Sequence, residues 1–218
     1  MNSLYNLAVG PLAWAAFIFL AVTAVWRLWS MSSLAKKKDA SSVAYMSWKF
    51  GLRSIFAWLI PYGTLGWKAN PVLTAVTYIF HITFVVLVIF VTPHQILLEN
   101  AFGITYPTLP SNVAHILTLV VIACCCYFAY RRVTHPTVRF VTRANDWWSL
   151  GFVAAPFITA FLAAFSIGGE LMPLLHVLTA EALIVAIPFT RLAHILFALF
   201  TRAYTGSEFG GVRHCKDW

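Results

Sequence analysis

The sequence has little charge. Only 10% of its 218 residues are Asp, Glu, Lys or Arg, whereas 61% are hydrophobic, and the mean hydropathy is +0.79. A water-soluble domain of this length needs far more charge to cover its surface. The apolar residues instead fall in blocks of about 20 residues, the length at which a helix crosses a hydrocarbon core of about 30 Å. The composition therefore argues against a soluble protein and predicts an all-α integral membrane protein.

Basic residues are missing from every second exposed segment. All 15 Lys and Arg lie in residues 27–68, 131–143 and 191–218, and none lies at the N-terminus, near 93–112 or near 168–175. Positive charge on alternate loops orients a multispan protein, with the basic side in the cytoplasm. The net charge of +8 is thus interpreted as a topology signal and not as a nucleic-acid surface. The N-terminus is predicted to be periplasmic and the C-terminus cytoplasmic.

Five apolar segments predict five transmembrane helices within a single membrane domain, residues 1–218. The first segment has no basic residue before it and no clear small-residue cleavage site after it, so we expect a retained span and not a signal peptide. The last segment contains Pro188, which lacks a backbone N–H and is expected to bend its helix. The expected spans are about 11–29, 72–92, 113–130, 148–167 and 174–200.

Cysteine is scarce and gives no sign of a metal site. Three of the four cysteines, Cys124, Cys125 and Cys126, are consecutive within an apolar block, so they lack the spacing of a zinc site or a structural disulfide. Cys215 stands alone near the C-terminus. We interpret the triplet as small residues that pack against a neighbouring helix.

The segment 42–60 is amphipathic. Aromatic and aliphatic residues alternate with Lys49 and Arg53, and Lys36, Lys37 and Lys38 precede them. Such a segment is typical of a helix in the membrane interface, with its bases among anionic headgroups. The alternative is a docking platform for a cytoplasmic subunit.

Four of the seven histidines belong to two of the expected spans. His81 lies in the cytoplasmic half of the second span and His94 at its outer end, and His176 and His194 belong to the fifth. An imidazole in a bilayer is costly unless it has a partner. Ligation of a haem iron by two histidines supplies one, because the iron binds one ring nitrogen and the other nitrogen donates a hydrogen bond. A cytochrome b with two haems needs two such histidines on each of two helices.

The spacing of these histidines predicts two pairs. His176 and His194 are 18 residues apart, which is five turns and roughly 27 Å on a continuous helix, so they share one face. Antiparallel packing then pairs His81 with His194 towards the cytoplasm and His94 with His176 towards the outside. The outer pair requires a bend, because 13 residues on a straight helix place His94 about 140° away from His81. Thr92-Pro93 is the expected bend. At each position a polar core histidine is the alternative.

The motif Pro188-Phe189-Thr190-Arg191-Leu192-Ala193-His194 resembles the end of the last helix in the respiratory nitrate reductase gamma subunit family of five-helix membrane cytochromes b. His176 lies at the matching upstream distance, and Phe80-His81-Ile82 is similar to the first ligand motif of the second helix. The resemblance covers roughly residues 70–205. It departs from the family at Val91, which occupies the usual position of the second ligand, so that His94 must serve instead. The basic residue that contacts quinol in that family has no clear counterpart here.

Within this family the chain looks most like the cytochrome b subunits of Hmc- and Tmc-type transmembrane redox complexes of sulfate-reducing bacteria. The features that carry this likeness are residues 58–67 (WLIPYGTLGW), Thr92-Pro93-His94 and Glu181. The resemblance implies two b haems in the bacterial inner membrane, of which the His81–His194 haem rests on the closer motif match. It also implies a menaquinone-type quinone and a role in anaerobic respiration and sulfate reduction. The implied partners are a cytoplasmic iron–sulfur subunit and a periplasmic multihaem cytochrome c.

Three further ionisable residues are candidates for cofactor contacts. His115 and Glu181 are the available groups near the outer side, where quinol oxidation would need proton exchange. Arg191 is a candidate partner for a haem propionate. Each residue also has a simpler interpretation. His115 is then an interfacial residue, Glu181 hydrogen-bonds a neighbouring helix, and Arg191 is an ordinary cytoplasmic anchor.

The sequence thus predicts an electron-transfer subunit of a quinone-linked oxidoreductase complex, without catalytic residues for a soluble substrate. A haem-free membrane anchor or scaffold is the first alternative, in which the histidines only tie helices together. A small transporter is the second, but no broken helices with a polar midplane cluster are evident.

Overall fold

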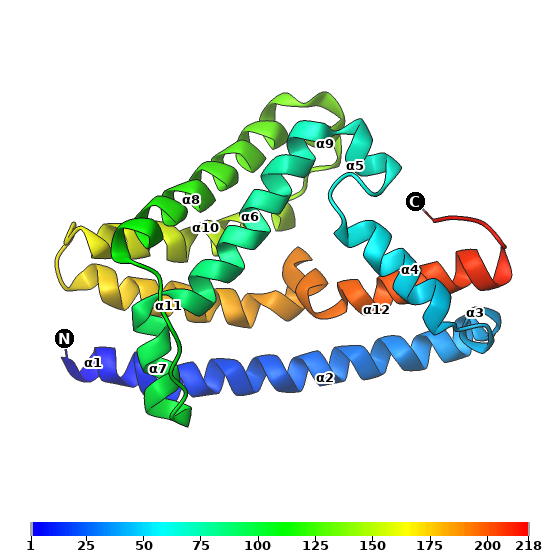
Figure 1. Ribbon diagram of the computed structural model, residues 1–218. Coiled ribbons are helices and arrows are strands. Elements are labelled where there is room, and N and C mark those ends of the chain that lie inside the picture. Colours follow the sequence, from blue (N-terminus) through cyan, green and yellow to red (C-terminus); the bar gives the residue numbers. More distant parts are fainter. Residues whose placement is uncertain (1, 218) are drawn as a thin grey trace. The chain divides into compact units, whose positions relative to one another are not determined.

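The structure, a computed structural model, describes residues 2–217, and within them every regular element is a helix (Figure 1). Five of these helices are long and apolar enough to cross a membrane, which confirms the prediction of an all-helical, multi-pass membrane protein. They are Ser3–Lys38, Pro71–Phe90, Ser111–Thr134, Ala144–Ala164 and Leu171–Phe189. The first combines α1 (Asn2–Leu7), a π-helical turn (Ala8–Leu12) and α2 (Ala13–Lys38). The π-helical turn contains Pro11, whose missing N–H interrupts the regular ladder.

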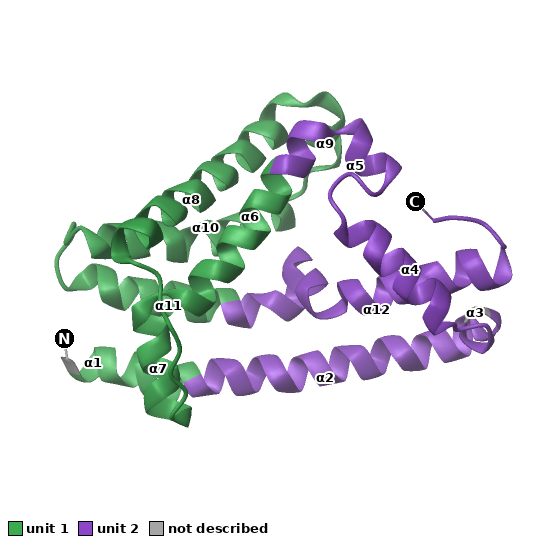
Figure 2. Ribbon diagram, in the orientation of Figure 1, with its two compact units in different colours: residues 1–13, 76–183 green, residues 14–75, 184–218 purple. Residues whose placement is uncertain are grey.

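Internal contacts divide the chain into two compact units (Figure 2). Unit 1 comprises residues 1–13 and 76–183, and unit 2 comprises residues 14–75 and 184–218. The single membrane domain stays a prediction.

Besides residues 1–13, unit 1 contains all or part of six helices. They are α6 (Pro71–Phe90, from Val76 onward), α7 (Thr92–Phe102), α8 (Ser111–Thr134), α9 (Pro136–Val141), α10 (Ala144–Ala164) and α11 (Leu171–Ala186, up to Leu183). Helices α8 and α10 run side by side (Figure 1). Cys124 and Cys125 are buried on α8, as expected of small packing residues, whereas Cys126 is exposed. At the basic end of this pair, Arg132 lies 3.5 Å from the buried carboxylate of Asp146.

The second span ends earlier than the sequence predicts. Helix α6 stops at Phe90, Val91 is extended (φ −79°, ψ 140°), and α7 begins at Thr92 with Pro93 in its first turn. Proline cannot donate to the carbonyl four residues back and its ring clashes there, but it fits the first turn of a new helix. The bend expected at Thr92-Pro93 is therefore present as a break between two helices.

The fifth span is also interrupted. Helix α11 ends at Ala186, 3₁₀ turns follow at Ile187–Phe189 and Arg191–Ala193, and α12 begins at His194 (His194–Ser207). Between the turns Thr190 is extended, and its hydroxyl oxygen accepts the N–H of Leu192 at 3.2 Å. The prediction of one helix over 174–200 is thus wrong, because Pro188 ends the helix and does not merely bend it. His176 lies in α11 and His194 begins α12, so the inference that both lie on one face of a single helix is wrong.

Unit 2 contains α2, α3 (Ala40–Ala44), α4 (Trp48–Leu59), α5 (Leu65–Ala69), α12 and a final π-helical turn (Glu208–Val212). Helix α4 packs closely against α12 (Figure 1). Ser47 donates its N–H to the Ser207 hydroxyl at 3.1 Å, and that hydroxyl donates to the Ser47 carbonyl at 3.2 Å. Gly51 of α4 faces Ala203 of α12, so small residues bring the two backbones together.

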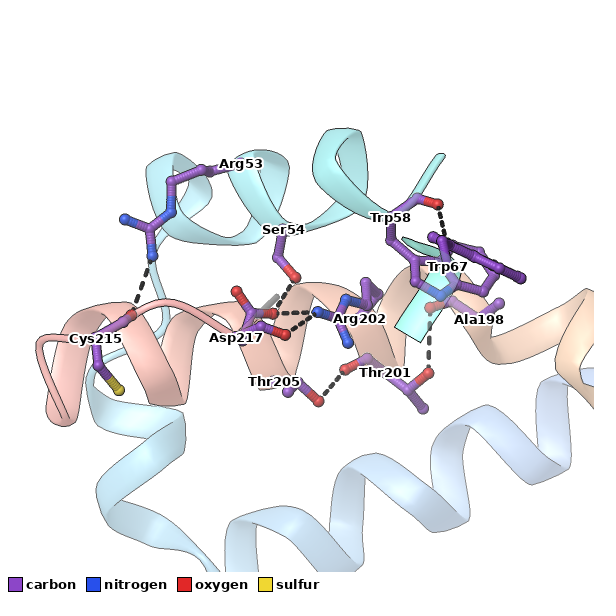
Figure 3. A network of polar contacts seen from close by, with 10 residues as sticks. All are labelled: Arg53, Ser54, Trp58, Trp67, Ala198, Thr201, Arg202, Thr205, Cys215 and Asp217. Carbon is purple, nitrogen blue, oxygen red and sulfur yellow. Dashed lines mark hydrogen bonds and ion pairs between the residues drawn. The ribbon is translucent and has the colours of Figure 1, made fainter. Parts of the chain in front are cut away.

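A polar network ties the C-terminal segment to this helix pair (Figure 3). The Asp217 side chain accepts a hydrogen bond from the buried Ser54 hydroxyl and pairs with the Arg202 guanidinium at 2.5 Å. Arg53 reaches the Cys215 carbonyl oxygen at 3.4 Å. The Asp217 side chain is only 1% exposed, so its charge depends on these partners.

The opposite face of α4 is apolar and exposed. Trp48, Leu52, Phe56 and Leu59 lie on it at helical spacing, and Trp48 is 85% exposed. Gly51 and Ser54 are buried on the face towards α12. The amphipathic pattern in the sequence thus corresponds to a helix with one packed face and one exposed apolar face.

Replacing Gly206 with alanine is expected to destabilise the α4–α12 pair by about 1–3 kcal/mol. A methyl group there would lie 2.7 Å from the Phe50 carbonyl oxygen and against the Ser54 side chain. Thermal unfolding in detergent micelles measures the effect. Gly151→Ala is the matched control, because its added carbon meets nothing within 4 Å, and we expect stability there to be unchanged or slightly higher. Equal melting temperatures for Gly206→Ala and the unsubstituted protein would contradict this packing.

Candidate functional site

Two histidine rings from different helices face each other in unit 1. His94 lies in the first turn of α7, and His176 lies in α11. The centres of their imidazole rings are 6.1 Å apart, and the ring planes are within 5° of parallel. The structure therefore brings together the two histidines that the sequence assigns to the outer pair.

The His94 ring is held by the end of the preceding helix. Its Nδ1 lies 2.8 Å from the Val88 carbonyl oxygen, in the last turn of α6. The break at Val91 makes this contact possible, because a helix continuing past residue 91 would use that carbonyl for its own ladder.

The His176 ring is held by α10. Its Nδ1 lies 2.9 Å from the Pro156 carbonyl oxygen. One turn further along both helices, the hydroxyl groups of Thr159 and Thr179 are 3.2 Å apart. Two side-chain contacts thus fix the crossing of α10 and α11 beside the ring.

This arrangement fits a pair of axial ligands to one metal ion. Because a carbonyl oxygen only accepts, each Nδ1 must carry its hydrogen, which leaves Nε2 with a free lone pair. A metal–imidazole bond is about 2 Å long. The ring centres are 6.1 Å apart, a distance over which two imidazoles can share one metal ion.

The protein donors at this pair are two imidazoles. Within residues 2–217, no group of three or more His, Cys, Asp or Glu side chains gathers around one point, so a zinc-type site with four protein ligands is not formed there. A haem needs only two axial ligands from the protein, since the porphyrin supplies the other four.

The remaining pair of predicted ligands falls in two different units. His81 belongs to unit 1 and His194 to unit 2, so each is described alone. The His81 Nδ1 lies 2.7 Å from the Thr77 carbonyl oxygen, and the His194 Nδ1 lies 2.8 Å from the Arg191 carbonyl oxygen. Both side chains are exposed.

The other candidate residues have separate surroundings. The His115 ring packs against Phe165, with ring centres 5.1 Å apart. Glu181 is only 7% exposed, and neither of its carboxylate oxygens has a hydrogen-bond partner among the described residues. Arg191 is exposed and lies in the 3₁₀ turn before His194. No hydrogen bond or ring contact within the described part of the chain joins His115 to Glu181.

Sequence reasoning missed the groups that orient the two rings. The contacts are with backbone carbonyls of Val88 and Pro156, which no residue type encodes. Pro156 gave no such signal, because a proline within a helix frees the carbonyl four residues before it and not its own carbonyl.

The chain is similar to a curated bacterial protein. No protein-family model matches the chain, and no solved structure matches it. A curated protein of Nitratidesulfovibrio vulgaris (strain Hildenborough) is 31% identical to it over 215 residues, and the match covers 94% of this chain and 93% of the relative. The name of that relative states no activity. On this likeness over nearly their whole lengths, the chain belongs to the same family as the N. vulgaris protein.

Proposed function

We propose that this chain is the membrane cytochrome b subunit of a respiratory redox complex. In this proposal His94 and His176 hold a b haem, and His81 and His194 hold a second one. The chain passes electrons between a menaquinone-type quinone and attached redox subunits. The observation that supports the proposal best is the His94–His176 geometry, with rings 6.1 Å apart and both Nδ1 atoms bound to carbonyl oxygens.

The residues around the outer pair prepare it for ligation. A bis-histidine haem takes up and releases one electron at a time. Helices α6 and α10 supply the carbonyl oxygens that fix both imidazoles in one tautomer. A hydrogen bond from Nδ1 also makes Nε2 more basic and therefore a better metal ligand. The Thr159–Thr179 contact keeps the supporting helices at a constant separation.

The second haem is proposed on the resemblance of Phe80-His81-Ile82 and of residues 188–194 to the ligand motifs of the nitrate reductase gamma family. The Nδ1 of each histidine lies within hydrogen-bond distance of a carbonyl oxygen in its own helix or in the preceding turn. Arg191 is proposed to pair with a propionate of this haem.

Quinone contact is proposed for Glu181 and His115. A buried carboxyl group without a hydrogen-bond partner in a membrane helix is a functional candidate. The proposed partners are a cytoplasmic iron–sulfur protein and a periplasmic multihaem cytochrome c. These partners are proposed from the resemblance to the nitrate reductase gamma family and to Hmc- and Tmc-type complexes. The same resemblance is the basis for the proposed role in anaerobic respiration and sulfate reduction.

We also propose the bacterial inner membrane as the location, with the N-terminus periplasmic and α4 in the cytoplasmic interface. The exposed apolar face of α4 and the nearby Lys49 support this placement. The alternative function is a haem-free membrane anchor, in which the same histidines would only hold neighbouring helices together.

Purified chain from a haem-producing host is expected to carry two protohaems, measured as the pyridine haemochrome. A reduced-minus-oxidised spectrum should show the α-band of a b-type cytochrome, and a short-chain menaquinol analogue should produce the same band without dithionite. A colourless, folded chain would contradict the cytochrome function and favour the anchor. A coloured chain that menaquinol cannot reduce would contradict only the quinone part.

A further inference from the structure

The last turn of α6 has lost its normal hydrogen-bond donors. In a continuous helix the carbonyl groups of Val88, Ile89 and Phe90 would accept the N–H groups of residues 92, 93 and 94. Here the helix breaks at Val91, and Pro93 has no N–H at all. Each of the three carbonyls must therefore find a donor from elsewhere.

All three carbonyls receive one. Val88 O is contacted by the His94 ring at 2.8 Å, and Ile89 O accepts the Tyr106 hydroxyl at 2.6 Å. Phe90 O accepts the N–H of Leu109 at 2.8 Å. Two of these donors belong to the segment 103–110, which connects α7 to α8; we term it the return loop.

The return loop is held against α6 by further contacts. The Tyr106 ring meets the Phe90 ring edge-on, with centres 5.9 Å apart. The hydroxyl groups of Thr92 and Thr108 are 3.0 Å apart, so the loop also contacts the first residue of α7. The turn into the loop uses Gly103 at φ +69°, a conformation that glycine adopts without strain.

We infer that Tyr106 is a positioning residue for His94, through the carbonyl ladder at the end of α6. This inference rests on the proposed haem ligation by His94 and His176. The Ile89 carbonyl lies between the one that binds the His94 ring and the one that binds the return loop. The Tyr106 hydroxyl is the donor that replaces the missing N–H of Pro93. It keeps the final turn of α6, and thus the Val88 carbonyl, in place.

The consequence concerns the angle between the two imidazole planes. They are now within 5° of parallel. Without the hydroxyl, the Ile89 carbonyl loses the donor that the described residues supply, and the end of α6 is expected to relax towards water or another donor. The Val88 carbonyl moves with it, and the His94 ring, whose Nδ1 contacts that carbonyl, is expected to turn.

Tyr106→Phe tests the inference because it removes only the hydroxyl and keeps the ring packed on Phe90. Electron paramagnetic resonance of the oxidised protein reports the angle between axial imidazole planes. Near-parallel planes give a rhombic low-spin signal, and rotation raises the largest g value. We expect two haems in the variant, a raised largest g value for the outer haem, a shifted outer potential and an unchanged inner haem. Tyr130→Phe is the control, since Tyr130 is 65% exposed at the end of α8.

If the resonance signal and the redox potential of the outer haem are the same in Tyr106→Phe as in the unsubstituted protein, the proposed role of Tyr106 is overturned. The proposal of haem ligation by His94 and His176 is not affected by that result. Failure of the proposed function is distinguishable, since the unsubstituted chain would then lack the outer haem signal altogether. If Tyr106→Phe does not fold, Thr108→Val decides the matter. It removes the neighbouring hydroxyl contact of the return loop and should shift the outer signal in the same direction by a smaller amount; no shift overturns the inference.

Discussion

Replacing His176 with alanine is expected to halve the haem content, from two protohaems per chain to one. Alanine offers no nitrogen to the iron, and the Pro156 carbonyl oxygen keeps only the Thr159 hydroxyl as a side-chain donor. A single axial histidine holds a haem in detergent far less firmly than two, because the bond and its fixed orientation are both lost. Pyridine haemochrome assays per mole of chain measure the loss, and the inner haem should keep its potential.

His94→Ala should give the same single remaining haem, since it removes the opposite ligand of the same pair. His135→Ala is the matched control, because His135 is an exposed residue between α8 and α9 and no cofactor role is assigned to it. Two haems in the His176→Ala protein, with an unchanged spectrum, would remove His176 from the ligand set.

The second large effect is expected from breaking the pair between Arg202 and Asp217. Arg202→Met should lower the free energy of unfolding by about 3–5 kcal/mol, the usual cost of leaving a buried charge without its partner. The Asp217 side chain is 1% exposed, and apart from Arg202 it has the Ser54 hydroxyl as a donor (Figure 3). Denaturant unfolding in micelles, followed by tryptophan fluorescence, measures the change.

Two comparisons make this result specific. Arg213→Met breaks an exposed pair with Glu208, and its expected cost is about 0–1 kcal/mol. Combining Arg202→Met with Asp217→Leu removes both charges, so most of the lost stability should return. A cost for Arg202→Met no larger than that for Arg213→Met would mean that the C-terminal segment does not depend on this network.

The five spans could be predicted because their signal is local. A helix in hydrocarbon needs about 20 apolar residues, and each block shows this without reference to its neighbours. The outer histidine pair could also be anticipated, since Thr92-Pro93 marks a break that redirects His94. The buried cysteines on α8 followed from their position in an apolar block.

Other features depend on contacts that no sequence window contains. Pro188 indicated a bend, but α11 ends there. The break continues through Thr190, which is extended and accepts the N–H of Leu192 with its hydroxyl oxygen. The donors that replace the lost ladder at the end of α6 come from Tyr106 and Leu109, 17 and 19 residues further along. Their partners are carbonyl oxygens, which every residue carries, so residue identity alone could not reveal them.

The most direct test of the central claim is the haem content of the double variant His94→Ala, His176→Ala. If both histidines ligate the same haem, each single variant and the double variant all retain one protohaem per chain, because the second substitution has nothing further to remove. If they ligate different haems, the double variant loses more haem than either single variant. One haem in all three proteins is the result that this account predicts, and a colourless double variant beside coloured single variants would contradict it.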